Sequence, residues 1–163
     1  MLAADPGLLA RTIGDALLQR GWRVAVAESC TAGLLGFSLT VPAGSSAWFS
    51  GGVLAYSNVV KERELSVDAG MLAAKVAVSE SVAAAMALGV RSRFGTELGV
   101  GITGIAGPGG GTEEKPVGLV FIGIDGPGAV SCVRRCLFPG DRASVREQSA
   151  VAAMQLIIDS LER

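Results

Sequence analysis

Short apolar runs typical of buried strands alternate along this chain with longer amphipathic stretches typical of helices. This alternation constrains the fold more than any other feature, because it is typical of α/β domains in which helices cover a sheet. The 163 residues are the length of one ordinary domain with a substantial core. We therefore expect a single three-layer α/β/α domain over residues 1–163, with a mixed, mostly parallel sheet and a hairpin in its C-terminal half.

Capping and turn residues mark the boundaries of these elements. Asp5 and Pro6 suit the start of a helix that Gly21 ends, and Ser79 suits the N-cap of another. The sequence Asp-Gly-Pro-Gly at 125–128 predicts the hairpin turn. The expected helices cover 6–20, 32–40, a short charged segment around 61, 68–77, 79–94 and from 141 or 144 to 161. The expected strands cover 22–27, 53–56, 99–103, 117–124 and 129–137.

The chain contains no histidine, which limits its chemistry strongly. Ser-His-Asp triads, Cys-His dyads and His-ligated metal sites are excluded within this chain. The three cysteines, Cys30, Cys132 and Cys136, cannot all pair with one another and match no zinc-binding spacing. Acid–base catalysis near neutral pH would therefore fall to Lys, Tyr, Asp, Glu or Cys side chains with shifted pKa values.

Charge and hydropathy predict the setting of the protein. A net charge of −1 provides no electrostatic footprint for nucleic acid or acidic membranes. The apolar stretches are interrupted well before about 18 residues, and the N-terminus carries Asp5 and no basic region typical of a signal peptide. We expect a cytoplasmic protein with no nucleic-acid or membrane partner.

Four segments carry more polar and glycine residues than packing requires. They are ESCTAG at 28–33, YSNVVK at 56–61, TGIAGPGGG at 103–111 and GDRASVR at 140–146. Two of them follow the ends of expected strands, and ligands of open α/β sheets bind beyond the carboxyl ends of the strands. We therefore expect a functional site there.

Ser29 is a candidate nucleophile between a strand and a helix, where backbone N–H groups can face a developing oxyanion. A helix N-cap is the alternative role, and Cys30 or Thr31 could fill either role. Without histidine, a desolvated lysine with a lowered pKa can serve as the base, which makes Lys61 a candidate, and Tyr56 could relay a proton. A solvated helix charge for Lys61 and a core aromatic for Tyr56 are the structural alternatives.

The glycine-rich segment after Thr103 can bring backbone N–H groups close to an anion. It matches neither a Walker A loop nor a Rossmann fingerprint, and a flexible connector is the alternative. Arg142 and Arg146, near the start of a helix, could bind phosphate or carboxylate or could lie on a solvated helix face. These residues alone indicate an anion-binding rim and a possible Ser–Lys centre, and they do not identify a substrate.

The same segments resemble the family formed by the C-terminal domain of competence-damage-inducible proteins (CinA) and the stand-alone nicotinamide mononucleotide deamidases. The resemblance runs from about residue 8 to residue 161. It is carried by AESCTAG (27–33), GSSAWFSGGVLAYSN (44–58), TGIAGPGGGTEEKPVG (103–118) and GDR (140–142). The chain departs from the family at Ala32, where a second glycine is common, and it resembles the stand-alone form, without an N-terminal nucleotide-processing domain.

The resemblance implies an amidohydrolase that converts nicotinamide mononucleotide to nicotinic acid mononucleotide and ammonia, a reaction of NAD recycling. It implies that Ser29 is the nucleophile and that Lys61 assists it, with Tyr56 in support. It implies no metal and no cofactor, and it favours a homo-oligomer. We accordingly expect substrate contacts from Thr31, Gly33, Ser46, Thr103, Gly104, Gly107, Gly109, Gly110 and Arg142.

Two other interpretations stay open at this point. The first is a non-catalytic nucleotide-binding or regulatory protein of the same fold, although binding alone needs no nucleophile and base. The second is a cysteine amidase built from Cys30, Glu28 and Lys61.

Overall fold

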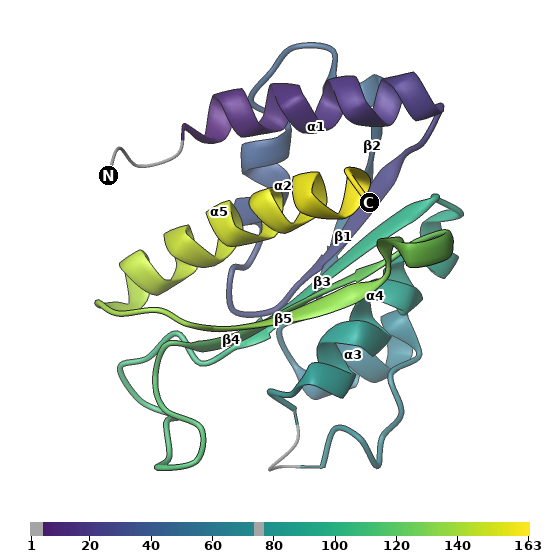
Figure 1. The fold of residues 1–163 in the computed structure, drawn as a ribbon. Helices are drawn as coiled ribbons and strands as arrows, with labels where there is room; N and C mark the ends of the chain where they lie inside the picture. Colours follow the sequence, from purple (N-terminus) through teal and green to yellow (C-terminus); the bar gives the residue numbers. More distant parts are fainter. Residues whose placement is uncertain (1–4, 74–76) are drawn as a thin grey trace.

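The computed structural model, which describes residues 5–73 and 77–163, places helices on both faces of a five-stranded sheet (Figure 1). The strands are β1 (Val24–Glu28), β2 (Phe49–Leu54), β3 (Leu98–Gly104), β4 (Leu119–Asp125) and β5 (Cys132–Leu137). The helices are α1 (Pro6–Arg20), α2 (Leu34–Leu39), α3 (Asn58–Leu65), α4 (Glu80–Phe94) and α5 (Arg142–Leu161), and two 3₁₀ turns are η1 (Ser45–Ala47) and η2 (Gly128–Val130).

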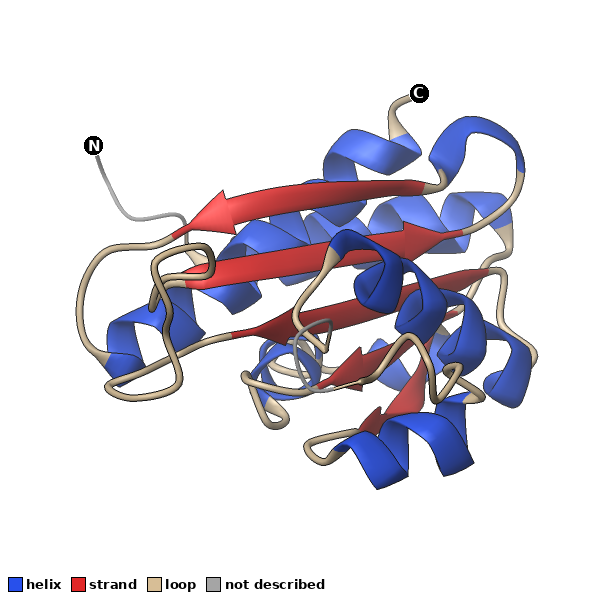
Figure 2. Cartoon of the chain, turned by 90° about the horizontal axis from the view of Figure 1, so that it is seen from below, coloured by secondary structure: helices blue, strands red, loops and turns tan. Residues whose placement is uncertain are grey.

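The strand order is β2-β1-β3-β4-β5. β1 is parallel to both β2 and β3, whereas β4 is antiparallel to both β3 and β5. β2, β1, β3 and β5 therefore point in one direction and β4 alone in the other, as the arrows in Figure 2 show. The mixed, mostly parallel sheet with a hairpin in the C-terminal half is confirmed.

Apolar clusters on both faces of the sheet separate the three layers. Ile13 of α1, Leu35 of α2 and Met154 of α5 share a cluster with sheet residues such as Val26. A second cluster, which includes Leu65 of α3 and Met86 of α4, packs on the other face of the sheet. Figure 1 shows α1, α2 and α5 on one side of the strands and α3 and α4 on the other. The expected three-layer arrangement is confirmed.

Alternation along β1 directs two polar residues to opposite faces. Val24 and Val26 belong to the cluster under α1, α2 and α5, and Ala25 and Ala27 to the cluster under α3 and α4. Since successive side chains of a strand point to opposite faces, the next two residues continue the pattern. Glu28 then faces α2, and Ser29 faces α3.

Most element boundaries follow local signals. Asp5 accepts a hydrogen bond from the Gly7 N–H at the start of α1, and Gly21 ends the helix in the left-handed conformation. Ser79 caps α4, and Asp141 caps α5. β5 begins at Cys132 rather than 129, because residues 128–130 form the 3₁₀ turn of the hairpin loop.

One expected element is wrong, and another is shifted. The helix expected over 68–77 is wrong in its described part, where residues 69–73 form turns and a bend although the Asp68 side chain accepts from the Met71 N–H; residues 74–76 lie outside the described residues. The strand expected at 53–56 is present but runs from Phe49 to Leu54, so it includes Gly52 and ends before Ala55. A Cβ at Gly52 would lie 2.6 Å from the Val26 carbonyl oxygen, so the close pairing with β1 requires this glycine.

No helix in the described ranges is long and apolar enough to span a bilayer.

Candidate active site

All four segments rich in polar and glycine residues meet at one edge of the sheet. They follow the carboxyl ends of β1, β2, β3 and β5, which are the four strands that share a direction. Because β5 points in the same direction as β3, the segment at 140–146 that follows it also lies at this edge. Ligands of open α/β sheets bind beyond such an edge, so the candidate site lies here.

Ser29 and Lys61 are in direct contact, although they are 32 residues apart in the sequence. Lys61 Nζ donates a hydrogen bond of 3.0 Å to Ser29 Oγ. Both residues are buried, with 8% of Ser29 and 3% of Lys61 exposed. The Ser29 N–H donates to the Ile102 carbonyl at 3.0 Å, which fixes the nucleophile candidate against β3.

Lys61 lies on the buried face of α3, so the interpretation as a solvated helix charge is wrong. Its Nζ also donates to the Tyr56 carbonyl at 3.2 Å. Burial lowers the pKa of Lys61 from its ordinary 10.5, with a small opposing effect from Cys30. In the described part of the chain no carboxylate forms an ion pair with Lys61. The surroundings therefore make deprotonation of this amine easier than that of an exposed lysine, as the role of general base requires.

The N-terminus of α2 is capped by Glu28, not by Ser29. The buried Glu28 carboxylate accepts hydrogen bonds from the N–H groups of Gly33, Leu35 and Gly36 at 2.8–3.1 Å. Gly33 is the N-cap residue in the left-handed conformation, with φ of 98° and no side-chain bond. The N-cap interpretation of Ser29 is therefore wrong, and its hydroxyl is available for chemistry.

Cys30 and Thr31 continue the turn after Ser29. Cys30 packs in the cluster under α5, and burial raises the pKa of its thiol to about 11. Thr31 is fully buried, and its hydroxyl has no hydrogen-bond partner among the described residues. The Thr31 carbonyl accepts from Arg146 Nη2 at 3.1 Å. A thiol this resistant to ionisation, and without the lysine contact of Ser29, is a poor nucleophile.

Arg142 connects two of the segments. Its Nη2 donates to the Tyr56 hydroxyl and its Nη1 to the Gly107 carbonyl, both at 2.8 Å. The Tyr56 side chain is 59% exposed, so the interpretation as a core aromatic is wrong. The structure thus brings Ser29, Lys61, Tyr56 and Arg142 to one edge.

The glycine-rich segment combines packing glycines with open ones. A Cβ at Gly104 would lie 3.1 Å from Cys30 Sγ, and one at Gly107 would lie 2.5 Å from Val117. Gly109 and Gly110 are exposed, and a Cβ at Gly109 would meet no atom within 4 Å. Packing therefore explains why glycine is needed at 104 and 107. It does not explain glycine at 109, where close approach of a ligand to the backbone would be a reason.

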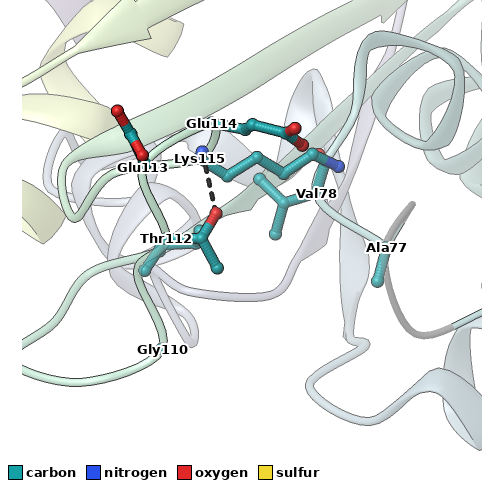
Figure 3. A pocket seen from close by; sticks show the side chains of 8 residues that line it. Ala77, Val78, Gly110, Thr112, Glu113, Glu114 and Lys115 are labelled. Atoms are coloured by element: carbon teal, nitrogen blue, oxygen red, sulfur yellow. Dashed lines mark hydrogen bonds between the residues drawn. The ribbon is translucent and has the colours of Figure 1, made fainter.

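A pocket of about 480 Å³ opens beside this segment (Figure 3). Its wall on the α4 side is formed by Ala77, whose carbonyl accepts a 3.0 Å hydrogen bond from the buried Thr103 hydroxyl. Lys115, on the opposite wall, donates to the Val78 carbonyl at 2.9 Å. The residues that line the pocket are Ala77, Val78, Ile105, Gly110, Thr112, Glu113, Glu114 and Lys115.

Ser46 is the one expected site residue that lies apart from this edge. It is exposed in η1, and its carbonyl accepts from Arg23 Nη2 at 3.1 Å. Arg23 precedes β1 and Ser29 follows it, so a strand length of roughly 16 Å separates the two positions. Within this chain, no hydrogen bond joins Ser46 to Ser29, Lys61, Tyr56 or Arg142.

Sequence reasoning did not identify the cap formed by Glu28 or the pocket wall at 77–78 and 112–115. The cap is local, since Glu28 accepts from N–H groups five to eight positions further along the chain, whereas the wall depends on contacts across the fold. The only sequence signal for residues 112–115 is the TEEK part of the long glycine-rich motif. No group of three or more His, Cys, Asp or Glu side chains in residues 5–73 and 77–163 could hold a metal ion.

Comparisons with known proteins agree along nearly the whole chain. Residues 8–161 match the family model of the CinA C-terminal domain. The chain is 52% identical over 161 residues to a putative competence-damage inducible protein of Moorella thermoacetica, covering 99% of this chain and 39% of that protein. It is 54% identical over 159 residues to a CinA-like protein of Gemmatimonas aurantiaca, covering 98% and 36%. The chain therefore spans about two fifths of the length of these relatives.

A solved structure shows the same fold. The competence/damage inducible protein of Agrobacterium tumefaciens superposes with a TM-score of 0.93 at 35% identity, covering 100% of this chain and 99% of that chain.

Proposed function

The chain belongs to the CinA C-terminal domain family, and we propose that it is an amidohydrolase that converts nicotinamide mononucleotide to nicotinic acid mononucleotide and ammonia. One observation carries the proposal: Lys61 Nζ lies 3.0 Å from Ser29 Oγ, and both groups are buried. A binding protein would have no need to bury a lysine against a serine hydroxyl. The resemblance of the four motifs to nicotinamide mononucleotide deamidases supplies the substrate.

The first step forms an acyl-enzyme. When Lys61 is neutral, the Ser29 hydroxyl donates to the lone pair of Nζ, and Lys61 takes this proton as Oγ attacks the carboxamide carbon. The carbonyl electrons move onto oxygen and form a tetrahedral oxyanion. The intermediate collapses when the C–N bond breaks and the departing nitrogen gains a proton, which yields ammonia and an ester between Ser29 Oγ and the nicotinoyl group, still attached to its ribose phosphate.

In this proposal, Tyr56 assists the departure of ammonia. Its hydroxyl oxygen accepts from Arg142, so its own proton remains available for donation. The proton that Lys61 took from Ser29 then passes to Tyr56, so Tyr56 is protonated again and Lys61 is neutral again. Water then attacks the acyl carbon while Lys61 accepts a proton from it, and nicotinic acid mononucleotide leaves with Ser29 restored.

The remainder of the substrate extends toward the glycine-rich segment. Arg142 is held at Gly107, and the pocket of about 480 Å³ lies beside Gly110. A guanidinium and open backbone N–H groups suit the ribose phosphate. Thr103 supports this side of the site through its bond to the Ala77 carbonyl.

Ammonia release from nicotinamide mononucleotide tests the proposal directly. We expect release by the purified protein, loss of release in Ser29→Ala, and normal release in the matched control Ser92→Ala, which changes an exposed serine on α4. Release that persists in Ser29→Ala would move the nucleophile elsewhere. A folded wild-type protein that releases no ammonia from this nucleotide would contradict the substrate.

Two wider features belong to the same proposal. The product would enter NAD recycling, and the protein would assemble as a homo-oligomer, as the resemblance implies. Light scattering of the purified protein measures the assembly, and a monomer at all concentrations would contradict it.

A further inference from the structure

The turn that follows Ser29 has few backbone donors left for a substrate. Most N–H groups between residues 29 and 36 already have acceptors within the protein, namely those of Ser29, Ala32, Gly33, Leu34, Leu35 and Gly36. The N–H group of Thr31 has no acceptor among the described residues, and that of Cys30 contacts only its own thiol. An oxyanion on the carbon attached to Ser29 needs donors within about 3 Å, and these two are the ones that this turn can offer.

Arg146 contacts this turn from behind. It belongs to α5, which covers the face of the sheet opposite to Lys61 on α3. Its Nη2 donates to the Thr31 carbonyl at 3.1 Å, and the two residues are 115 positions apart. The contact fixes the orientation of the peptide group between Thr31 and Ala32, and therefore restrains the backbone of the turn.

The contacts of Arg146 do not indicate that it stabilises the fold. Its Nε is buried without a hydrogen-bond partner in the described part of the chain, and no carboxylate there pairs with it. A buried donor without a partner costs free energy, so the position of this Nε calls for another reason. The neighbouring Thr31 hydroxyl is likewise buried and unpartnered.

We propose that Arg146 is a positioning residue, which holds the turn at Thr31 so that the N–H groups of Cys30 and Thr31 stabilise the oxyanion. This inference rests on the proposed hydrolysis and names the oxyanion donors of the same site. The positive charge of Arg146 behind the turn also favours negative charge in front of it. Arg146 therefore differs in role from Arg142, which lies on the substrate side with Tyr56 and Gly107.

Steady-state kinetics separate positioning from substrate binding. An oxyanion interaction exists only in the transition state, so its loss lowers kcat and leaves KM nearly unchanged. We expect Arg146→Ala to lower kcat for nicotinamide mononucleotide at least tenfold with KM within about twofold. Arg146→Lys should recover part of the loss, because an ammonium group can still donate to the Thr31 carbonyl.

A fluorophosphonate probe tests the oxyanion site without the natural substrate. Ser29 Oγ bonds to phosphorus, fluoride leaves, and the phosphoryl oxygen occupies the position of the oxyanion. We expect intact-mass measurements to show labelling of the wild type that is absent in Ser29→Ala and at least tenfold slower in Arg146→Ala. Circular dichroism verifies the fold, and Arg146→Gln replaces Arg146→Ala, with the same expected loss, where the alanine variant does not fold.

The outcomes distinguish this inference from the proposed function. Labelling that depends on Arg146, in a protein that releases no ammonia from nicotinamide mononucleotide, would support the inference and contradict the substrate. A raised KM with unchanged kcat would make Arg146 a substrate-binding residue and overturn the inference. Equal labelling rates in folded wild-type and Arg146→Ala proteins, or no labelling of the wild type, would overturn it as well.

Discussion

Arg142 donates a 2.8 Å hydrogen bond to the hydroxyl of Tyr56, although the two residues are 86 positions apart. The second donor of the same guanidinium reaches the Gly107 carbonyl at 2.8 Å. Arg142 therefore joins the segment after β2 to the glycine-rich segment after β3, and it does so from the first residue of α5. The bridge depends on the planar fork of the guanidinium, because two donors must point at two different acceptors.

Replacing Arg142 with lysine tests this bridge. A single ammonium group cannot keep both contacts in the same geometry, so we expect kcat/KM for nicotinamide mononucleotide to fall at least tenfold, chiefly through KM. Arg135→Lys, which changes an exposed arginine on β5, should leave both constants unchanged. An unaltered kcat/KM in Arg142→Lys would show that the bridge does not contribute to the site.

The rate of hydrolysis should depend on pH through Lys61. The base must be neutral, so kcat/KM falls as the pH drops below the pKa of Lys61 and levels off above it. Burial lowers that pKa from 10.5, so the plateau should begin at a lower pH than an ordinary lysine would give. A pH profile of kcat/KM measures the ionisation, and Lys61→Arg, which cannot deprotonate, should be inactive throughout. A profile without an ionisation on its acidic side would exclude Lys61 as the base.

The fold could be predicted from the sequence where local chemistry decides it. Asp5, Gly21 and Ser79 mark helix ends through caps and backbone conformation, and the structure confirms all three. The helix expected over 68–77 is wrong in its described part: Asp68 accepts from the Met71 N–H as it would at a helix start, but residues 69–73 form only turns and a bend. The start of β2 was missed because glycine is rare in strands, and only the pairing with Val26 shows why Gly52 is needed.

The site could be predicted as a set of segments, but not as a geometry. The burial of Lys61 is hidden in the sequence by the charged residues that follow it on α3, two of which are exposed. The direction of β5, which brings Arg142 to the same edge as Ser29, depends on the pairing of the whole sheet. Contacts over 86 and 115 residues, such as those of Arg142 and Arg146, have no local signal.

Removal of the Cys30 thiol should preserve activity. The pKa of the thiol is raised to about 11 by burial, and its side chain packs under α5 rather than against Lys61. We expect Cys30→Ala to keep kcat within about threefold of the wild type, since the backbone N–H is retained, and to lower the free energy of unfolding by about 1 kcal/mol through lost packing. Ammonia release and urea unfolding measure the two effects. Loss of turnover in a folded Cys30→Ala protein, with turnover retained in Ser29→Ala, would support the cysteine mechanism instead.

Ala32 should lower the free energy of unfolding relative to a glycine at the same position. Its φ is 49°, in the left-handed region that disfavours residues with a Cβ. We expect Ala32→Gly to raise the free energy of unfolding by about 0.5–1 kcal/mol. The matched control is Ala84→Gly at an exposed position of α4, which should lower it by about 0.5–1 kcal/mol. Urea unfolding of both variants makes the comparison, and destabilisation of similar size in both would contradict the strain at Ala32.

Lys61 should also lower the free energy of unfolding, because its amine is buried and burial disfavours the charged form. The unfolded chain binds a proton at this lysine up to about pH 10.5, whereas the folded protein releases it at lower pH. The unfolded state therefore binds more protons between the lowered pKa and 10.5, and stability should rise with pH across that window. Methionine has a similar length and no charge, so Lys61→Met should abolish hydrolysis, remove this pH dependence and raise the free energy of unfolding at neutral pH by about 1 kcal/mol.

The control for this change is Arg63→Met on the same helix, whose side chain is 70% exposed and whose replacement should alter stability by no more than about 0.5 kcal/mol. Urea unfolding across the pH range provides the measurement. A lower stability of Lys61→Met would mean that the hydrogen bonds to Ser29 and the Tyr56 carbonyl outweigh the cost of burial. Lys61 would then be a structural anchor of α3 as well as a base, and the preference for its neutral form would have to come from the bound substrate rather than from the fold.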